Sequence, residues 1–323
     1  MKANLSKAIL VLLVLVTFTE CKKKSSAPAE EEPAVVTPAP TGINTIAQVF
    51  TTNGVQAQTA AVSATAAQTF TASGVKIEIP ANAFKTASGG TVTGNVNVTI
   101  KGILTKKDII LTGAPANGGT ANKLIATKGC IKVSASQSGQ TLRIAPGQNF
   151  FVNVVEPGAV PLSNIRKFLA PKVSTSDSTI CWNADPDSVN VGSVLDSVSG
   201  KYYYRARIDS ATWLNVGQKW DTTATKTSVT ITTSANFNKT NTAVYISLNG
   251  IMVVGALYEI TPNVFRISNI PVGRAVNIVG VGIINGQYYS AILPVTVTAG
   301  FNQPLNLLPV TISQLQGQLN ILP

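Results

Sequence analysis

Residues 264–300, VFRISNIPVGRAVNIVGVGIINGQYYSAILPVTVTAG, carry the clearest structural pattern in the chain. A strand is expected over 264–268, a turn over 270–273 (Ile-Pro-Val-Gly) and an apolar strand over 275–284. Asn285–Gly286 then predicts a two-residue hairpin, because Asn-Gly accepts the positive φ of a type I′ turn. Short strands separated by turn residues at this spacing indicate an antiparallel β structure.

The same pattern extends outward over most of the chain. Apolar and polar residues alternate over 75–79 (VKIEI) and again over 244–248 (VYISL), and Gly or Pro punctuates such segments. This favours an all-β protein of sandwich type over a βαβ protein. Further strands are expected at 109–112, 130–136, 141–145, 150–155 and 202–208. Asn249–Gly250 predicts a second two-residue hairpin, residues 43–66 suggest a short helix, and the tail from Leu305 to Pro323 suggests a last strand.

Changes in composition divide the chain into five parts. We predict a signal peptide over 1–20, an acylated cysteine and a Pro/Glu-rich linker over 21–42, and an N-terminal β domain over 43–170. A polar inter-domain region over 171–200 leads to a C-terminal β-sandwich over 201–323. The inter-domain acidic residues do not follow an EF-hand pattern, so they are interpreted as solvated turn residues and no metal site is predicted.

Two stretches resemble known families. The order of strand, Ile-Pro-x-Gly, strand, Gly-x-Tyr and Val-x-Val over 264–300 resembles the prealbumin-like sandwich of carboxypeptidase regulatory-like domains. Residues 74–84 (GVKIEIPANAF) resemble an element of ZU5-like domains, with Asn82 where Gly is common. The first resemblance implies a domain that supports or spaces other modules and carries no catalytic residues of its own, and the second implies a β-rich interaction module.

The N-terminus has the layout of an export signal. Lys2 and Lys7 precede the apolar run Ala8–Val16, which is far shorter than the roughly 20 residues that a membrane span needs. Cys21, followed by three lysines, resembles the acylated cysteine of Bacteroidota-type envelope lipoproteins, although Glu20 departs from the small residue expected there. The resemblance implies a protein anchored by lipid to the outer membrane, on its periplasmic or its surface face. An uncleaved N-terminal anchor is the alternative.

The charge of the chain indicates the kind of partner it meets. The formal net charge is +11, but the basic residues are spread thinly and accompany no nucleic-acid module. Nucleic acid is therefore not expected as a partner. The expected partners are the membrane, through the lipid anchor, and an envelope protein or polysaccharide.

The residues required for common catalytic chemistry are missing. The chain contains no histidine, which excludes Ser-His-Asp triads and most zinc sites, and no phosphate-binding glycine loop. We expect no catalytic residue and no cofactor, and hence a structural or interaction role. A histidine-independent glycosidase, which needs only two carboxylates, is one alternative. A carbohydrate-binding module is another, with Trp213 and Trp220 stacking on sugar rings, although packing in the core or between domains is the favoured interpretation of both tryptophans.

Cysteine use leaves two interpretations open. With Cys21 acylated, Cys130 and Cys181 could form a disulfide in an oxidising compartment, which would stabilise the fold by about 4 kcal/mol. Two buried free thiols are the alternative, because free cysteine behaves as a small hydrophobic residue.

Overall fold

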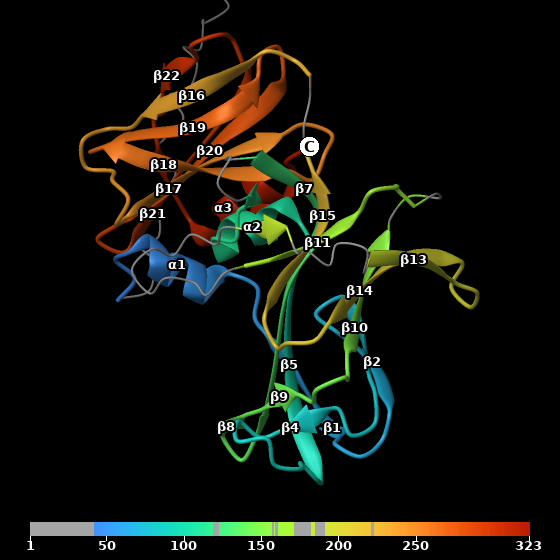
Figure 1. The fold of residues 1–323 in the computed structure, drawn as a ribbon. Helices are drawn as coiled ribbons and strands as arrows, with labels where there is room; N and C mark the ends of the chain where they lie inside the picture. The colour runs from blue at the N-terminus through green and yellow to red at the C-terminus, as the bar shows by residue number, and fades with distance from the viewer. Residues whose placement is uncertain are drawn as a thin grey trace, which may run out of the picture. The chain divides into compact units, whose positions relative to one another are not determined.

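The computed structural model describes residues 42–118, 123–156, 158, 161–170, 182–184, 191–220 and 223–323. Several features predicted from the sequence lie outside these residues: the signal peptide, Cys21, Cys181 and residues 185–190 of the predicted inter-domain region. Three large sheets and one small ribbon account for most of the described chain, which confirms the predicted all-β, sandwich-like class (Figure 1). No described helix is long and apolar enough to cross a membrane.

The first two sheets pack face to face around one apolar core, to which Val98 and Ile131 contribute from one side and Ile77 and Val152 from the other. The first sheet has the order β1 (Gln58–Ser63), β5 (Asn95–Ile103), β7 (Lys123–Gln137), β15 (Trp213–Lys219), β11 (Arg166–Leu169) and β12 (Asn183–Ala184), with β6 (Asn117–Gly118) and β8 (Gln140–Thr141) also paired to β7. The second has the order β13 (Val191–Asp196), β14 (Lys201–Ile208), β10 (Phe150–Glu156), β3 (Val75–Ile79) and β2 (Gln68–Ala72). A ribbon of β4 (Phe84–Lys85) and β9 (Arg143–Ile144) lies beside them.

The third sheet surrounds a second core that includes Ile246, Phe265 and Ile278. Its order is β22 (Asn302–Pro304), β16 (Lys226–Thr232), β19 (Val264–Pro271), β18 (Val254–Thr261), β17 (Thr242–Leu248), β20 (Ala275–Ile284), β21 (Gln287–Thr296) and β23 (Leu308–Val310). Asn285 and Gly286 have φ of 49° and 77° and join β20 to β21, which confirms the predicted hairpin.

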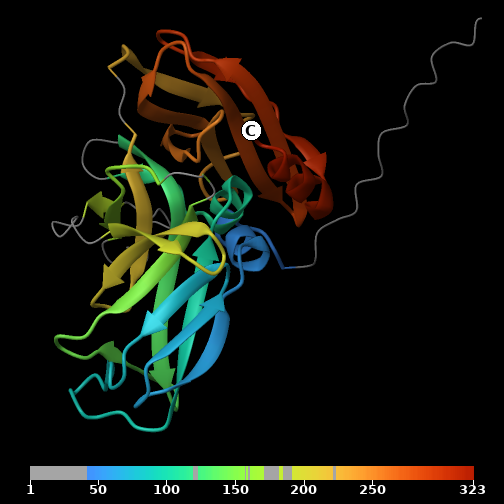
Figure 2. The same ribbon diagram turned by 90° about the vertical axis from the view of Figure 1, so that its right-hand side faces the viewer.

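Three short helices gather where the first sheet meets the third (Figures 1 and 2). They are α1 (Ile46–Asn53), α2 (Lys106–Thr112) and α3 (Ile312–Asn320). Their apolar residues, which include Val49, Ile110 and Leu315, share a third cluster with Cys130 of the first sheet and Tyr245 of the third. Residues 36–323 consequently form one compact unit.

The third sheet begins later in the chain than the predicted C-terminal domain. The strands β14 and β15, over 201–219, pair with β10 and β7 of the first two sheets. The third sheet begins only at Lys226. The domain division itself stays a prediction, but the predicted start of the C-terminal sandwich at Lys201 precedes the first strand of the third sheet by two strands.

Three predicted elements differ from the structure. The expected strand at 109–112 lies in α2, whose N-cap Thr105 accepts a 3.1 Å hydrogen bond from the Asp108 amide and which ends at a left-handed Gly113. The strands β17 and β18 form a hairpin around Asn249–Gly250, but its loop has five residues, between Leu248 and Val254, and not the expected two. In the tail, the expected last strand is limited to β23, which pairs with β21, and residues 312–320 form α3, whose start is defined by a capping box of Thr311 and Gln314.

Candidate functional site

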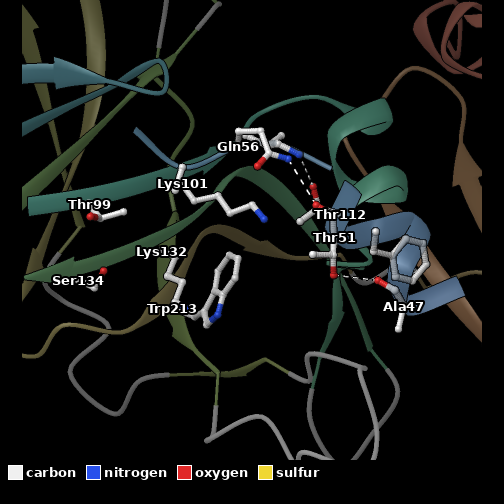
Figure 3. A pocket seen from close by; sticks show the side chains of 12 residues that line it. Ala47, Thr51, Gln56, Thr99, Lys101, Thr112, Lys132, Ser134 and Trp213 are labelled. Atoms are coloured by element: carbon white, nitrogen blue, oxygen red, sulfur yellow. Dashed lines mark hydrogen bonds between the residues drawn. The ribbon is translucent and has the colours of Figure 1, made fainter. Parts of the chain in front are cut away.

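A hollow of about 490 Å³ lies between α1 and the outer face of the first sheet (Figure 3). We call it the Trp213 hollow. One side consists of residues from α1 and from the segment that follows it, and the other consists of side chains from β5, β7 and β15. Its volume is within the range of small-molecule sites. Its described lining residues are Ala47, Phe50, Thr51, Val55, Gln56, Ala57, Thr99, Lys101, Thr112, Lys132, Ser134 and Trp213.

The floor of the hollow is a row of three side chains on adjacent strands. Lys101 of β5 is directly opposite Lys132 of β7, and Lys132 is directly opposite Trp213 of β15. Successive side chains of a strand point to opposite faces, so Ile100 and Ile131 enter the core while the two lysines point outward. The Lys132 ammonium lies 5.6 Å from the centre of the Trp213 ring system, in a cation–π contact.

A second row lies beside the first. Thr99 and Ser134 are also directly opposite each other on β5 and β7, two residues along each strand from the lysines. Their hydroxyls therefore face the same side of the sheet as the lysine ammoniums. The floor thus combines two cations, an aromatic face and two hydroxyls in a small area (Figure 3).

The opposite wall is fixed by the packing of α1 against α2. A capping box between Thr45 and Gln48 defines the start of α1. At the other end, the amide of Val55 donates a 3.1 Å hydrogen bond to Oγ1 of Thr112. Phe50 lies against Gly113, where an added Cβ would come within 2.5 Å of the phenyl ring. This close approach allows the two helices to form one wall.

The floor of the hollow carries two positive charges, and no carboxylate of the described lining compensates them. Burial lowers the pKa of Lys101, and the charge of nearby Lys132 lowers it further. Neither lysine forms an ion pair with another described residue. The described lining also contains no carboxylate. The hollow is therefore a positively charged site without an internal counter-ion in the described part of the chain.

The other side of the sandwich provides a useful contrast. On the second sheet, the Arg205 guanidinium forms an ion pair with Glu78 and stacks 3.6 Å from the centre of the Phe151 ring. Lys76 there lies 4.0 Å from a carboxylate oxygen of Asp196. Arg205 and Lys76 thus have carboxylate partners within the protein, unlike the two lysines of the Trp213 hollow.

A buried ion pair lies between the two sheets. The Lys128 ammonium is 2.7 Å from Oε2 of Glu156, and the amide of Gly158 donates to Oε1 of the same carboxylate. The hydrogen bonds from Lys128, Tyr204 and Gly158 outweigh the effect of burial and lower the pKa of Glu156. Burial and the adjacent carboxylate raise the pKa of Tyr204 to about 12. Because this group is enclosed and internally paired, it has a structural role.

The two tryptophans predicted to stack on sugars lie in different environments. Trp213 lines the hollow, whereas Trp220 is half-buried against the core of the third sheet. The backbone amide of Trp220 donates to the carbonyl of Leu124 at 2.8 Å, which ties this residue into the packing. The structure does not bring the two rings together, so a platform built from both is not formed.

The predicted cysteine sites are only partly within the described residues. Cys130 is fully buried and forms no disulfide with another described residue, and burial raises its pKa to about 12. Cys181 and the acylation site Cys21 lie outside the described residues, so the predicted disulfide and the lipid anchor both stay predictions. The side chain of Trp182, the neighbour of Cys181, belongs to the same apolar cluster as Cys130.

Sequence reasoning missed Lys101 and Lys132. They lie far apart from each other and from Trp213 along the chain, and only strand pairing makes them neighbours. Among the residues the structure describes, no group of three or more cysteine or acidic side chains could hold a metal ion. No protein-family model matches the chain, and a search of curated proteins gives no match either.

Proposed function

We propose that this chain is a lipid-anchored protein of the cell envelope that binds a saccharide and does not catalyse a reaction. The observation that carries the proposal is the Trp213 hollow, where an indole is placed beside hydroxyl and ammonium donors. Sugar rings have apolar faces that an aromatic side chain covers, and their hydroxyls need polar partners around the edge. A cavity of about 490 Å³ with such a lining is suited to a few sugar rings.

Binding is favoured over glycoside hydrolysis by the chemistry of the lining. A glycosidase needs two carboxyl groups flanking the scissile bond, one of which donates a proton. The described residues of the hollow offer lysines, threonines, a serine and an aromatic ring, but no aspartate or glutamate. These groups can hold and orient a sugar, and they supply no pair of acid and nucleophile.

The anchoring part of the proposal rests on the sequence around Cys21. Acyl chains on this cysteine would hold the protein at the membrane, because each buried methylene contributes about 0.8 kcal/mol. Cys21→Ser is expected to release the protein from the membrane fraction of cells. A mutant that remains in the membrane after a carbonate wash would refute the lipid anchor.

The binding part is tested on the mature body with a panel of immobilised oligosaccharides, both neutral and acidic. Binding is expected, and Trp213→Ala should weaken it about tenfold, the equivalent of 1.4 kcal/mol. Trp220→Ala is the matched control, since this residue does not line the hollow and its removal should leave affinity unchanged in protein that remains folded. Absence of binding, or binding that survives Trp213→Ala, would overturn the proposal.

A further inference from the structure

We infer that the saccharide held in the Trp213 hollow is acidic, and that its carboxylate binds between the ammonium groups of Lys101 and Lys132. This inference rests on the proposed function and specifies the class of ligand. It begins from the register of β5 and β7, which places the two lysines directly opposite each other.

A cross-strand pair of like charges is unfavourable on its own. Side chains directly opposite each other in an antiparallel sheet have Cβ atoms about 4.5–5.5 Å apart, and like charges at such positions destabilise the sheet. The lowered pKa of Lys101 has the same physical origin, in part, because Lys132 disfavours its charged form. A bound anion between the two ammoniums would reverse the sign of this interaction.

The protein does not supply that anion from its described residues. Elsewhere on the sandwich, Arg205 pairs with Glu78 and Lys128 pairs with Glu156. Lys101 and Lys132 have no such ion pair, and the Lys132 ammonium is instead near the face of Trp213. The half-burial of Lys101 reduces solvent screening, which strengthens its attraction to an anion that enters the hollow.

The shape and lining of the site favour a sugar over a membrane surface or an acidic peptide. A ring stacked on Trp213 would extend along the row toward Lys132 and Lys101, which places a carboxylate at the lysines. The adjacent hydroxyls of Thr99 and Ser134 lie on the same face and can exchange hydrogen bonds with ring hydroxyls. One stacked ring, one carboxylate and several hydroxyls together describe a uronic acid.

The inference is tested with two pairs of probes. These are oligogalacturonate and oligomannuronate, each compared with its fully methyl-esterified form, in titrations followed by calorimetry at 20 mM and 300 mM NaCl. At least one acidic oligomer should bind about tenfold more tightly than its ester, because hydrogen bonds from an ammonium group to a carboxylate are stronger than those to a neutral ester. Affinity for the acid should fall at the higher salt concentration, and affinity for the ester should change little.

Variants assign the preference to the two lysines. Lys101→Gln and Lys132→Gln should each remove the preference for the acid and leave binding of the ester unchanged. Lys219→Gln is the matched control, because it makes the same change in net charge at an exposed position of β15 outside the hollow. Thermal unfolding of each variant checks that the fold is intact.

The outcomes separate this inference from the proposed function. Equal affinity for acids and esters, with binding lost in Trp213→Ala, would overturn the acidic ligand but leave saccharide binding standing. No binding of any saccharide on the panel would overturn both. Lysine-dependent binding to vesicles containing phosphatidylglycerol, with neither oligomer binding or competing, would assign the site to an anionic lipid surface and likewise overturn the inference.

Discussion

Replacing Lys101 with methionine should make the unliganded protein more stable. The substitution keeps the length and apolar stem of the side chain and removes an ammonium that burial and Lys132 both disfavour. Cross-strand charge pairs contribute about 0.2–1 kcal/mol, and Lys101 is only half-buried, so a gain of about 0.5–1 kcal/mol is expected. For the compact unit of residues 36–323, this corresponds to an increase in Tm of roughly 1–2 °C.

The physical origin of the gain can be checked with salt and pH. The repulsive part should shrink between 10 mM and 1 M NaCl, because the Debye length falls from about 30 Å to about 3 Å. The pKa of Lys101 is lower in the folded protein than in the unfolded chain, so the penalty is fully present at neutral pH. It is lost as the pH rises through the folded pKa toward the unfolded value of about 10.4, and the advantage of the variant should shrink over that interval.

Circular dichroism during heating is a suitable assay, with Lys219→Met as the control of equal charge change. The control should alter the free energy of unfolding by less than about 0.5 kcal/mol, as is usual for exposed positions. If Lys101→Met lowers Tm relative to this control, the ammonium must be compensated within the protein. The reasoning that the floor of the hollow is electrostatically unbalanced would then be refuted.

Three further predictions test the helix packing, the Lys128–Glu156 ion pair and the buried thiol. Gly113→Ala should lower the free energy of unfolding in urea by about 1–3 kcal/mol, because φ is +64° and the new methyl group would meet the ring of Phe50; an unchanged transition would contradict this packing. Glu156→Gln should cost about 1–3 kcal/mol at pH 7 by leaving the partly buried Lys128 without its counter-ion, and the loss should diminish as acid protonates Glu156 in the wild type; a double-mutant cycle with Lys128→Met measures the coupling. In native protein, Cys130 should react with a thiol reagent only after unfolding, because the thiol is buried and its pKa is about 12; non-reducing mass spectrometry shows whether it is a free thiol in solution.

The strands that could be predicted from the sequence are those in which apolar and polar residues alternate in step with more and less buried side chains. Residues 75–79 alternate strictly, and in β3 their burial alternates in the same way. Asn82, which stands where the ZU5-like element commonly has Gly, has φ of 56°, a conformation that Asn tolerates better than most residues. The Asn285–Gly286 hairpin was predictable for the same reason, since the conformation of these two residues decides the turn.

The sequence predicts a short helix within 43–66, where α1 lies, but α2 was difficult to predict because short apolar runs are ambiguous. Ile109, Ile110 and Leu111 favour a strand by composition, and the deciding features are the caps at Thr105 and Gly113. Capping alone does not stabilise a helix of seven residues. Tertiary packing supplies most of the stability, and buried residues of α2 belong to the cluster shared by the three helices. Packing of this kind joins residues that are far apart in the chain, so a short stretch of sequence does not reveal it.

Of the three side chains in the first row of the floor, only Trp213 could be identified from the sequence. Trp213 could be identified as a candidate because aromatic rings can stack on sugars, but its local sequence does not separate this role from packing, and in the structure the ring also packs against the apolar cluster of the helices. Lys101 and Lys132 could not be selected, because nothing in their local sequence separates them from other solvated lysines. Their importance depends on the pairing of β5 with β7 and of β7 with β15, which is long-range information.

The two outer faces of the sandwich differ in how their charges are compensated, and this difference supports the proposed position of the ligand. On the second sheet, Arg205 and Lys76 are paired with Glu78 and Asp196, so an anion binding to either cation would have to displace a carboxylate. The first sheet presents two adjacent cations next to an aromatic ring, and α1 forms a wall beside them. In the proposed complex, the ligand supplies the missing negative charge, and the pair of like charges becomes favourable. The cost is lower stability of the unliganded protein, which Lys101→Met should recover.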